Sequence, residues 1–175
     1  MEYMLKRSTR ARAMRLTVHP DGAVVVTAPN FFGLHAIERF LAQHSEWVRR
    51  KVDATKGRRV IRIARSDIPI LKRRALTLAR ERCEYFAKLY GVRFGKISIR
   101  AQKSRWGSCS HTGNLSFNYR IAALPPELRD YIIVHEICHL LELNHSKKFW
   151  AQVARAIPTH KALRKEMRNI VFVFC

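Results

Sequence analysis

The N-terminal third of the chain shows first an alternating and then a helical pattern of apolar residues. Residues 14–18 and 23–27 are short runs rich in β-branched side chains, and Pro20 and Gly22 between them suit a tight turn. Apolar positions across residues 33–51 then recur at roughly helical spacing. The pattern predicts a β-hairpin followed by one helix.

The middle of the chain predicts a long helix and two strands after a basic linker. The linker covers residues 49–65 and includes one short strand-like run. Residues 68–90 carry a helical apolar stripe that ends at Gly91. Residues 96–101 and 114–120 alternate as strands do.

The last fifty residues predict three more helices. The first begins at Pro125 and Pro126, because proline is favoured in the first turn. Residues 146–157 and 159–171 give the other two, separated by Pro158. We therefore expect an α+β chain in two parts. Residues 1–65 form an N-terminal hairpin and helix region with the basic linker, and residues 66–175 form a larger domain.

The helix that follows Pro126 carries the motif His135-Glu136-x-x-His139. Each helical residue turns about 100°, so the two histidines lie about 40° apart on one face, where both imidazoles can bind one zinc ion. Glu136 projects about 100° away, which suits a base that deprotonates a metal-bound water rather than a ligand.

The rest of this helix is apolar. Between Tyr131 and Leu143 the only polar residue outside the motif is Glu142, so a helix buried nearly all round is expected. Ionisable groups in such a place need a partner, and a metal ion would provide one. The alternative is a chance match to the motif by hydrogen-bonded core histidines.

A third ligand can come from three places. His145 has the spacing of the metzincins, but the glycine of their turn is replaced by Glu142. It can reach the metal only if the helix stops near residues 142–144, with Asn144 in the left-handed conformation that ends helices and Ser146 as the next cap. Glu142 and the distant Glu166 are the other candidates, and His145 is the preferred one.

The chain is strongly basic. Lys and Arg number 34 against 13 Asp and Glu, which gives a formal net charge of +21, and eleven basic residues lie between Arg49 and Arg74. Such a charge in the N-terminal half predicts binding of nucleic acid or another polyanion. A solvated basic surface without a partner is the alternative.

Other features of the sequence favour a cytoplasmic protein. No apolar run approaches the roughly 18 residues of a membrane span, and the first 15 residues lack the apolar core of a signal peptide. The four cysteines form no CxxC pair, so neither a disulfide framework nor a zinc ribbon is expected. Cys109 and Cys138 are interpreted as small buried residues rather than metal ligands.

Four motifs in fixed order resemble the YgjP-like metallopeptidases, relatives of the SprT-like proteins. They are Lys103-Ser-Arg-Trp-Gly-Ser-Cys109, Gly113-Asn-Leu-x-Phe-Asn118, Tyr131-Ile-Ile-Val-His-Glu-Ile-Cys-His139 and Asn144-His-Ser-x-x-Phe-Trp150. The resemblance covers about the last 80 residues closely and the N-terminal hairpin loosely. One departure is that residues 52–67 are too short for the β-hairpin that the family carries after its first helix.

The resemblance implies a zincin-like fold, with a small twisted sheet whose edge strand borders the active-site cleft. On this chain the edge would be residues 114–120 or 96–101, and a peptide substrate could pair with it as an added strand. Trp106 and Ser108 would shape the wall of the cleft. Their alternative is a core tryptophan in a glycine-containing turn.

These observations predict a zinc metallopeptidase. Zinc would be held by His135, His139 and His145, and Glu136 would act as general base on the attacking water. Tyr119 and Arg105 are candidates for stabilising the oxyanion. The alternatives are a non-enzymatic, zinc-stabilised nucleic-acid-binding domain and a protease recruited to nucleic acid.

Overall fold

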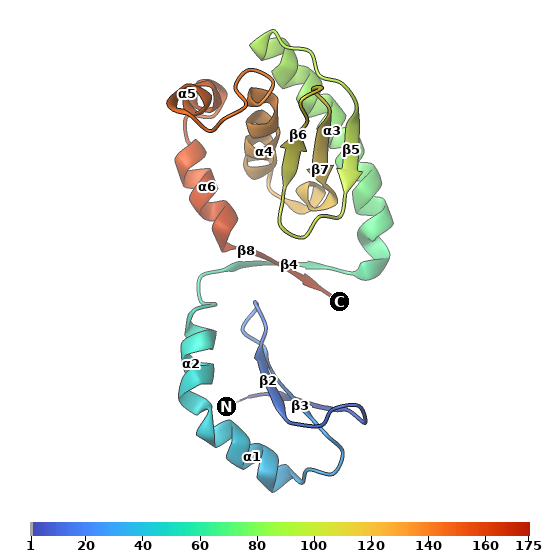
Figure 1. The fold of residues 1–175 in the computed structure, drawn as a ribbon, viewed down its shortest axis with the longest axis vertical. Helices are drawn as coiled ribbons and strands as arrows, with labels where there is room; N and C mark the ends of the chain where they lie inside the picture. The colour runs from blue at the N-terminus through green and yellow to red at the C-terminus, as the bar shows by residue number, and fades with distance from the viewer. Residues whose placement is uncertain (1) are drawn as a thin grey trace. The chain divides into compact units, whose positions relative to one another are not determined.

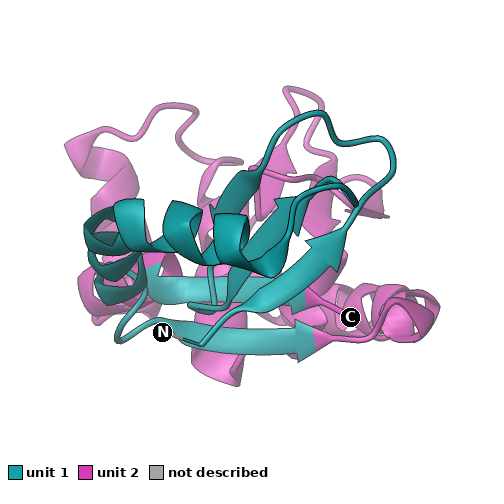
Figure 2. Ribbon diagram, turned by 90° about the horizontal axis from the view of Figure 1, so that it is seen from below, with its two compact units in different colours: residues 1–62, 169–173 teal, residues 63–168, 174–175 magenta. Residues whose placement is uncertain are grey.

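The computed structural model describes residues 2–175, which divide into two compact units (Figure 1 and Figure 2). Unit 1 contains the chain up to Arg62 together with residues 169–173. Unit 2 contains residues 63–168 and 174–175. The chain therefore leaves unit 1 after Arg62, returns to it for residues 169–173, and ends in unit 2.

Unit 1 begins with a three-stranded sheet and two helices. They are β1 (Met4–Arg7), β2 (Arg15–Val18), β3 (Val24–Ala28), α1 (Leu34–Gln43) and α2 (Ser45–Asp53). The central strand β3 pairs parallel with β1 and antiparallel with β2, which confirms the predicted hairpin. Gly22 in its turn has φ +88°, a conformation that glycine adopts without strain.

The single helix predicted over residues 33–51 is wrong, because the helix is broken at His44. This residue has φ −106° and ψ 9°, outside the helical region, and its Nδ1 lies 2.8 Å from the carbonyl oxygen of Phe40. The chain therefore turns between α1 and α2. The core of this part is wholly apolar and consists of Val26, Ala28, Ile37 and Leu41.

The C-terminal end of the chain differs from its prediction. The last helix, α6 (His160–Asn169), is followed by β8 (Ile170–Phe174), where a continuing helix was expected. The run Ile-Val-Phe-Val-Phe is β-branched and aromatic, which favours a strand. It pairs with β4 (Arg59–Ile63) in a two-stranded sheet. The strand in the linker thus takes its partner from the end of the chain rather than from a local hairpin.

Unit 2 contains the predicted long helix and a second three-stranded sheet. The helix is α3 (Ile68–Tyr90), preceded by a 3₁₀ turn η1 (Arg65–Asp67), and it ends at Gly91 in the left-handed conformation with φ +66°. The sheet has the order β5 (Ile97–Arg100), β7 (Leu115–Asn118), β6 (Gly107–Cys109). β6 lies between the two predicted strands, in a stretch for which no strand was predicted.

The remaining helices of unit 2 are η2 (Tyr119–Ala123), α4 (Pro126–Cys138), α5 (Lys147–Ala156) and α6. α4 contacts α3, α5 and β6, and in Figure 1 it lies between α5 and α6 on one side and β6 on the other. Arg82 of α3 donates two hydrogen bonds to the carboxylate of Asp130 on α4, at 2.9 and 2.7 Å. This bidentate pair fixes the two helices against each other.

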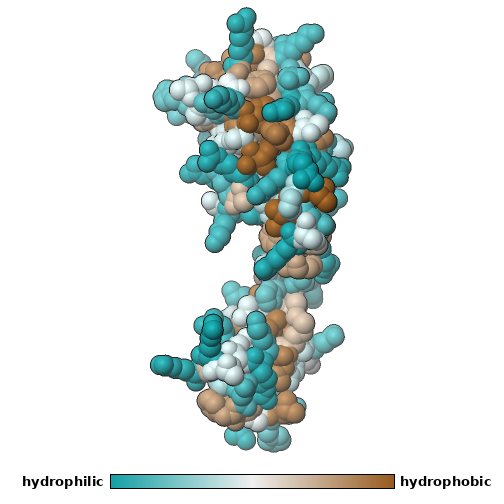
Figure 3. Space-filling view, turned by 90° about the vertical axis from the view of Figure 1, so that its right-hand side faces the viewer, coloured by the Kyte–Doolittle hydropathy of each residue, from teal (hydrophilic) through white to brown (hydrophobic). Residues whose placement is uncertain are grey.

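The α+β class expected from the sequence is confirmed by this mixture of helices and small sheets. None of the helices within residues 2–175 is long and apolar enough to cross a membrane. Hydrophilic side chains project from most of the face drawn in Figure 3, with apolar patches between them.

Candidate metal centre

α4 is buried on nearly every side, as its composition predicted, but it is shorter than expected. Its buried residues run from Leu128 to Cys138, and the helix ends there, with His139 as its C-cap. Leu141 and Leu143 are 42% and 59% exposed. The expected end near residues 142–144 is therefore wrong by about one turn.

The chain turns back after α4 without a left-handed residue. No non-glycine residue among those described has a positive φ, so the left-handed Asn144 that we expected is wrong. Instead, the amides of Leu141 and Glu142 donate to the carbonyl of Cys138 at 3.1 and 2.9 Å. His139 Nδ1 lies 3.1 Å from the Glu142 carbonyl oxygen. The ring of His139 itself thus closes the turn.

This turn brings His135, His139 and His145 together. His145 Nε2 lies 3.0 Å from His135 Nε2, and one ring nitrogen from each of the three lies within 4.8 Å of the others. Among residues 2–175, this is the group of histidine, cysteine and carboxylate side chains able to surround an ion, and neither Glu142 nor Glu166 belongs to it. Ser146 accepts a hydrogen bond from the Phe149 amide and begins α5 directly after His145.

Phe149 forms the base of this histidine group. Its fully buried ring lies 4.9, 4.6 and 4.7 Å from the rings of His135, His139 and His145, centroid to centroid. The sequence alone did not predict this contact, because Phe149 entered only as part of a motif. The signal was its place in the Asn144-His-Ser-x-x-Phe-Trp150 motif, one helical turn after the third histidine.

The three imidazoles fit a divalent metal ion. Burial, together with the other two histidines and Arg164, lowers the pKa of His135 to about 3, and burial lowers the pKa of His145. Neutral rings are what a metal requires, since its ligands must be deprotonated. The His139 Nδ1–H donated to the Glu142 carbonyl leaves Nε2 as the free lone pair. Nitrogens bound to one tetrahedral zinc lie about 3.3 Å apart, and the Nε2 atoms of His135 and His145 are close to that spacing.

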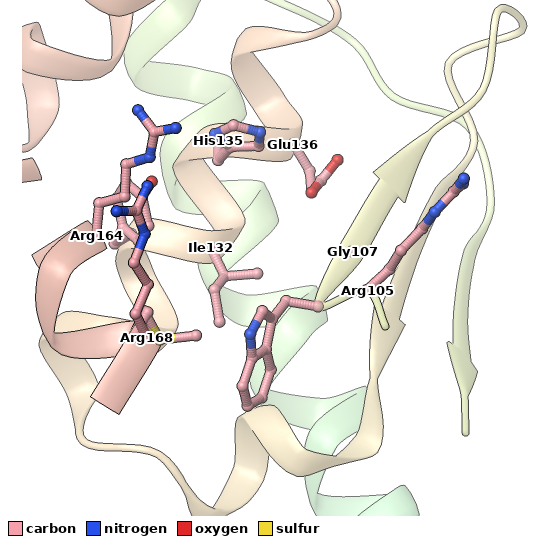
Figure 4. A pocket seen from close by; sticks show the side chains of 10 residues that line it. Arg105, Gly107, Ile132, His135, Glu136, Arg164 and Arg168 are labelled. Carbon is pink, nitrogen blue, oxygen red and sulfur yellow. The ribbon is translucent and has the colours of Figure 1, made fainter. Parts of the chain in front are cut away.

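Glu136 lies beside the histidine group in a confined place. Its side chain is only 6% exposed, and burial raises its pKa to about 8. It points from α4 toward the strand that begins at Gly107 (Figure 4). A Cβ atom added at Gly107 would lie 2.7 Å from Cγ and Oε1 of Glu136. Glycine at this position therefore makes room for the carboxyl group.

The cleft is bordered by β6, so the edge strands expected from the resemblance are wrong. Residues 115–118 form the central strand, and residues 97–100 form the opposite edge of the sheet. Gly107, Ser108 and Cys109 line one cavity together with the histidine group, and Trp106 lines a second cavity beside Glu136. Trp106 and Ser108 therefore line the walls of the cleft, as the resemblance implied.

The remaining candidates are two cysteines and the two residues considered for stabilising the oxyanion. Cys138 is fully buried as expected, with its pKa raised to about 11 by burial, whereas Cys109 is half-exposed at the cleft. Neither belongs to the ion-binding group. Of the two oxyanion candidates, Arg105 lines the cavity beside Glu136, and Tyr119 is buried in η2 and lines neither cavity.

Comparisons with known proteins identify the family of the chain. No curated protein matches the chain with significance. The zymogen of the metallopeptidase abylysin from Pyrococcus abyssi is 26% identical, over 53% of this chain and 99% of its own, with a TM-score of 0.47. The zymogen of jannalysin from Methanocaldococcus jannaschii is 21% identical, over 51% and 93%, with a TM-score of 0.46. The YgjP-like metallopeptidase family matches residues 12–69 and 67–170, and the chain belongs to that family.

Proposed function

We propose that this metallopeptidase holds zinc through His135, His139 and His145 and cleaves peptide bonds with Glu136 as the general base. The observation that carries the proposal is the convergence of three imidazoles beside one buried carboxyl group. Three protein ligands leave a fourth position for water or substrate, as catalytic zinc sites require.

A bound zinc ion supplies positive charge that polarises a carbonyl group and acidifies a water molecule. The protein's own contribution is the Glu136 carboxyl. Burial without a counter-charge raises its pKa to about 8, and a nearby cation lowers the pKa of a carboxyl group. The two effects oppose each other, and a carboxyl group whose pKa lies close to the working pH can both take a proton and give it back. Glu136 accepts the proton of the attacking water and donates it to the departing amine.

The free edge of β6 is the proposed binding place for the substrate main chain. The Ser110 amide donates to Asn114 and the Asn118 amide donates to the Trp106 carbonyl, at 2.8 Å each. Because antiparallel strands alternate, the amide and carbonyl groups of Gly107 and Cys109 then face away from β7. An extended peptide can pair with these groups and pass across the histidine cluster.

The test is the Glu136→Gln substitution, measured together with the metal content. We expect the variant to bind zinc as the parent protein does, because the change removes no ligand. Hydrolysis of a mixed peptide library should fall about a hundredfold to ten-thousandfold. Full activity of this variant would refute the proposed mechanism, and loss of its zinc would refute the assignment of Glu136 as a residue that binds no metal.

A further inference from the structure

The cavity beside Glu136 has both apolar and cationic lining residues. Its volume is about 470 Å³, within the range of cavities that bind small ligands. Trp106, Ile132 and Met167 give it an apolar lining, and Arg105, Arg164 and Arg168 are its cationic lining residues. The guanidinium of Arg105 points away from those of Arg164 and Arg168 (Figure 4). Figure 4 shows Arg164 and Arg168 on α6 at one side, with His135 and Glu136 of α4 facing the space between α6 and Gly107.

The two arginines of α6 share one helix face. Residues four apart lie nearly above each other on a helix, and Met167 between them turns the same way. Arg164 is also held in position, because its guanidinium lies 5.0 Å from the Trp150 ring, which stacks on His145 at 5.8 Å. The Trp150 ring thus lies between the guanidinium of Arg164 and His145, the proposed third ligand.

These guanidinium groups have no acidic partner within the protein. Across residues 2–175, no carboxylate lies within 4.0 Å of Arg105, Arg164 or Arg168. Glu136 is the one acid that lines this cavity, and its carboxyl group points toward Gly107 rather than toward the arginines of α6 (Figure 4). The cavity therefore combines an apolar lining with arginine side chains whose positive charge no carboxylate of the described residues balances.

We propose that this cavity binds a carboxylate of the substrate at a residue next to the scissile bond. The inference rests on the proposed function and names its substrate class. Guanidinium groups recognise carboxylates through paired hydrogen bonds, and the apolar lining accommodates the methylene groups that carry the carboxylate. A basic side chain would meet like charge in the same place. The carboxylate comes either from an internal Glu or Asp or from the free C-terminus of the substrate.

Two pairs of matched peptide sets distinguish an internal carboxylate from a C-terminal one. Internal peptides carry Glu or Gln at each position around the cleaved bond, with both ends blocked, and terminal peptides end in a free carboxylate or an amide. We expect kcat/KM about tenfold higher for the charged member of one pair, which corresponds to one charge-assisted contact. A preference for the internal Glu assigns the site to acidic side chains, and a preference for the free end assigns it to chain termini.

The variants Arg168→Gln and Arg164→Gln should reduce that preference to below about threefold. Lys165→Gln removes the same charge from an exposed residue of α6 outside the cavity, and it should keep the preference. Because Arg164 also contacts Trp150, Arg168→Gln decides the outcome if Arg164→Gln folds poorly. Equal kcat/KM within every pair, or an unchanged preference in Arg168→Gln, would overturn the carboxylate site.

Binding provides a readout that is independent of catalysis. Glu136→Gln protein, titrated with fluorescent peptides of the same pairs, should bind the charged member more tightly, and added salt should narrow the difference. If no peptide is cleaved by the parent protein but this preference holds, the cavity is as inferred and the proposed hydrolysis fails. If neutral peptides are cleaved as fast as charged ones, the hydrolysis stands and the cavity inference fails.

Discussion

The two units of this protein differ in what they bury. The core around the first sheet of unit 1 contains only apolar side chains. The buried polar residues among those that the structure describes, Asn118, Glu136 and His160, all belong to unit 2. Buried polar groups destabilise a fold unless they are hydrogen-bonded. Unit 2 therefore carries an unfavourable feature that unit 1 lacks.

The three buried polar residues are not equivalent. Asn118 donates to the carbonyls of Gln102 and Arg105 and so fixes the loop that leads into β6, and His160 Nδ1 lies 3.2 Å from the Ile157 carbonyl oxygen. Glu136 has no hydrogen-bond partner within residues 2–175. Two of the three thus serve the structure, whereas the third has no structural explanation. Glu136 is the group that function must explain.

The two units hardly differ in their net charge per residue. Residues 1–62 contain 13 basic and 5 acidic residues, a net of +8, which leaves +13 of the total +21 for the rest of the chain. Relative to their lengths, the two units are about equally positive. The expected nucleic-acid surface therefore needs a test that compares positions rather than totals.

The largest expected effect is loss of the metal. Replacing His135, His139 or His145 by Ala removes one of three ligands, so each variant should lose zinc and at least about a thousandfold of its peptidase activity. Zinc content after dialysis and kcat/KM on one peptide measure both. Glu166→Ala and Glu142→Ala are the matched controls. If Glu166→Ala lost zinc while His145→Ala kept it, the third ligand would be the distant acid.

The metal-free protein should become less stable as pH rises above about 6.5. The pKa of Glu136 is raised to about 8, so the folded state keeps a proton that the unfolded chain releases above its ordinary pKa of 4.5. This contribution is present at low pH and is lost as pH rises, by up to about 1.4 kcal/mol per pH unit. Below about pH 6.5 the lowered pKa of His135 has the opposite effect, so the net loss of stability is expected between about pH 6.5 and 8. Urea unfolding in chelator should show it in the parent protein.

Glu136→Gln should remove this slope, because glutamine does not titrate. Glu127→Gln, which removes an exposed carboxyl group of the same helix, controls for the loss of an acid. Identical pH dependence in the parent protein and in Glu136→Gln would contradict the burial of a carboxyl group without a partner.

The sequence predicted the parts of the site that follow from local periodicity. The helix that carries His135 and His139, the capping Ser146 and the long helix that ends at Gly91 all follow from spacing and cap chemistry. The end of α4 did not, because an apolar run continues to Leu143. There the ring of His139 bonds to the backbone, and no propensity describes such a contact.

Long-range pairing was the other source of error. β6 has only three residues, which is too short to show an alternating pattern of its own. It becomes a strand by pairing with β7, which follows it after a turn of polar residues. β8 was predicted as the end of a helix, although its composition favours a strand. The requirement for Gly107 came from a contact with residue 136, and this distance along the chain hides it from any local pattern.

A smaller effect is expected from Gly107→Ala. The added methyl group would overlap the Glu136 side chain at 2.7 Å, so the carboxyl group must move while the metal ligands stay. A misplaced base should reduce kcat about tenfold to a hundredfold with unchanged zinc content. Gly33→Ala in unit 1 is the control, since its Cβ meets no atom within 4 Å. Activity of Gly107→Ala within twofold of the parent would show that the close approach has no role.

The smallest expected effect on peptide cleavage comes from surface charge. If the basic stretch between Arg49 and Arg74 tracks phosphates, the quadruple substitution R49Q/R50Q/R73Q/R74Q should flatten the dependence of log K on log salt for duplex DNA. The expected change in slope is about 0.9 for each lost contact. K147Q/K148Q/K161Q/K165Q removes the same charge from exposed residues of α5 and α6, and should leave the slope unchanged.

Cleavage of a short peptide should be equal in both variants, because none of these eight residues lines the cavities at the site. Equal slopes for the two variants would mean that DNA responds to the total charge and that no surface in the N-terminal half is built to bind it.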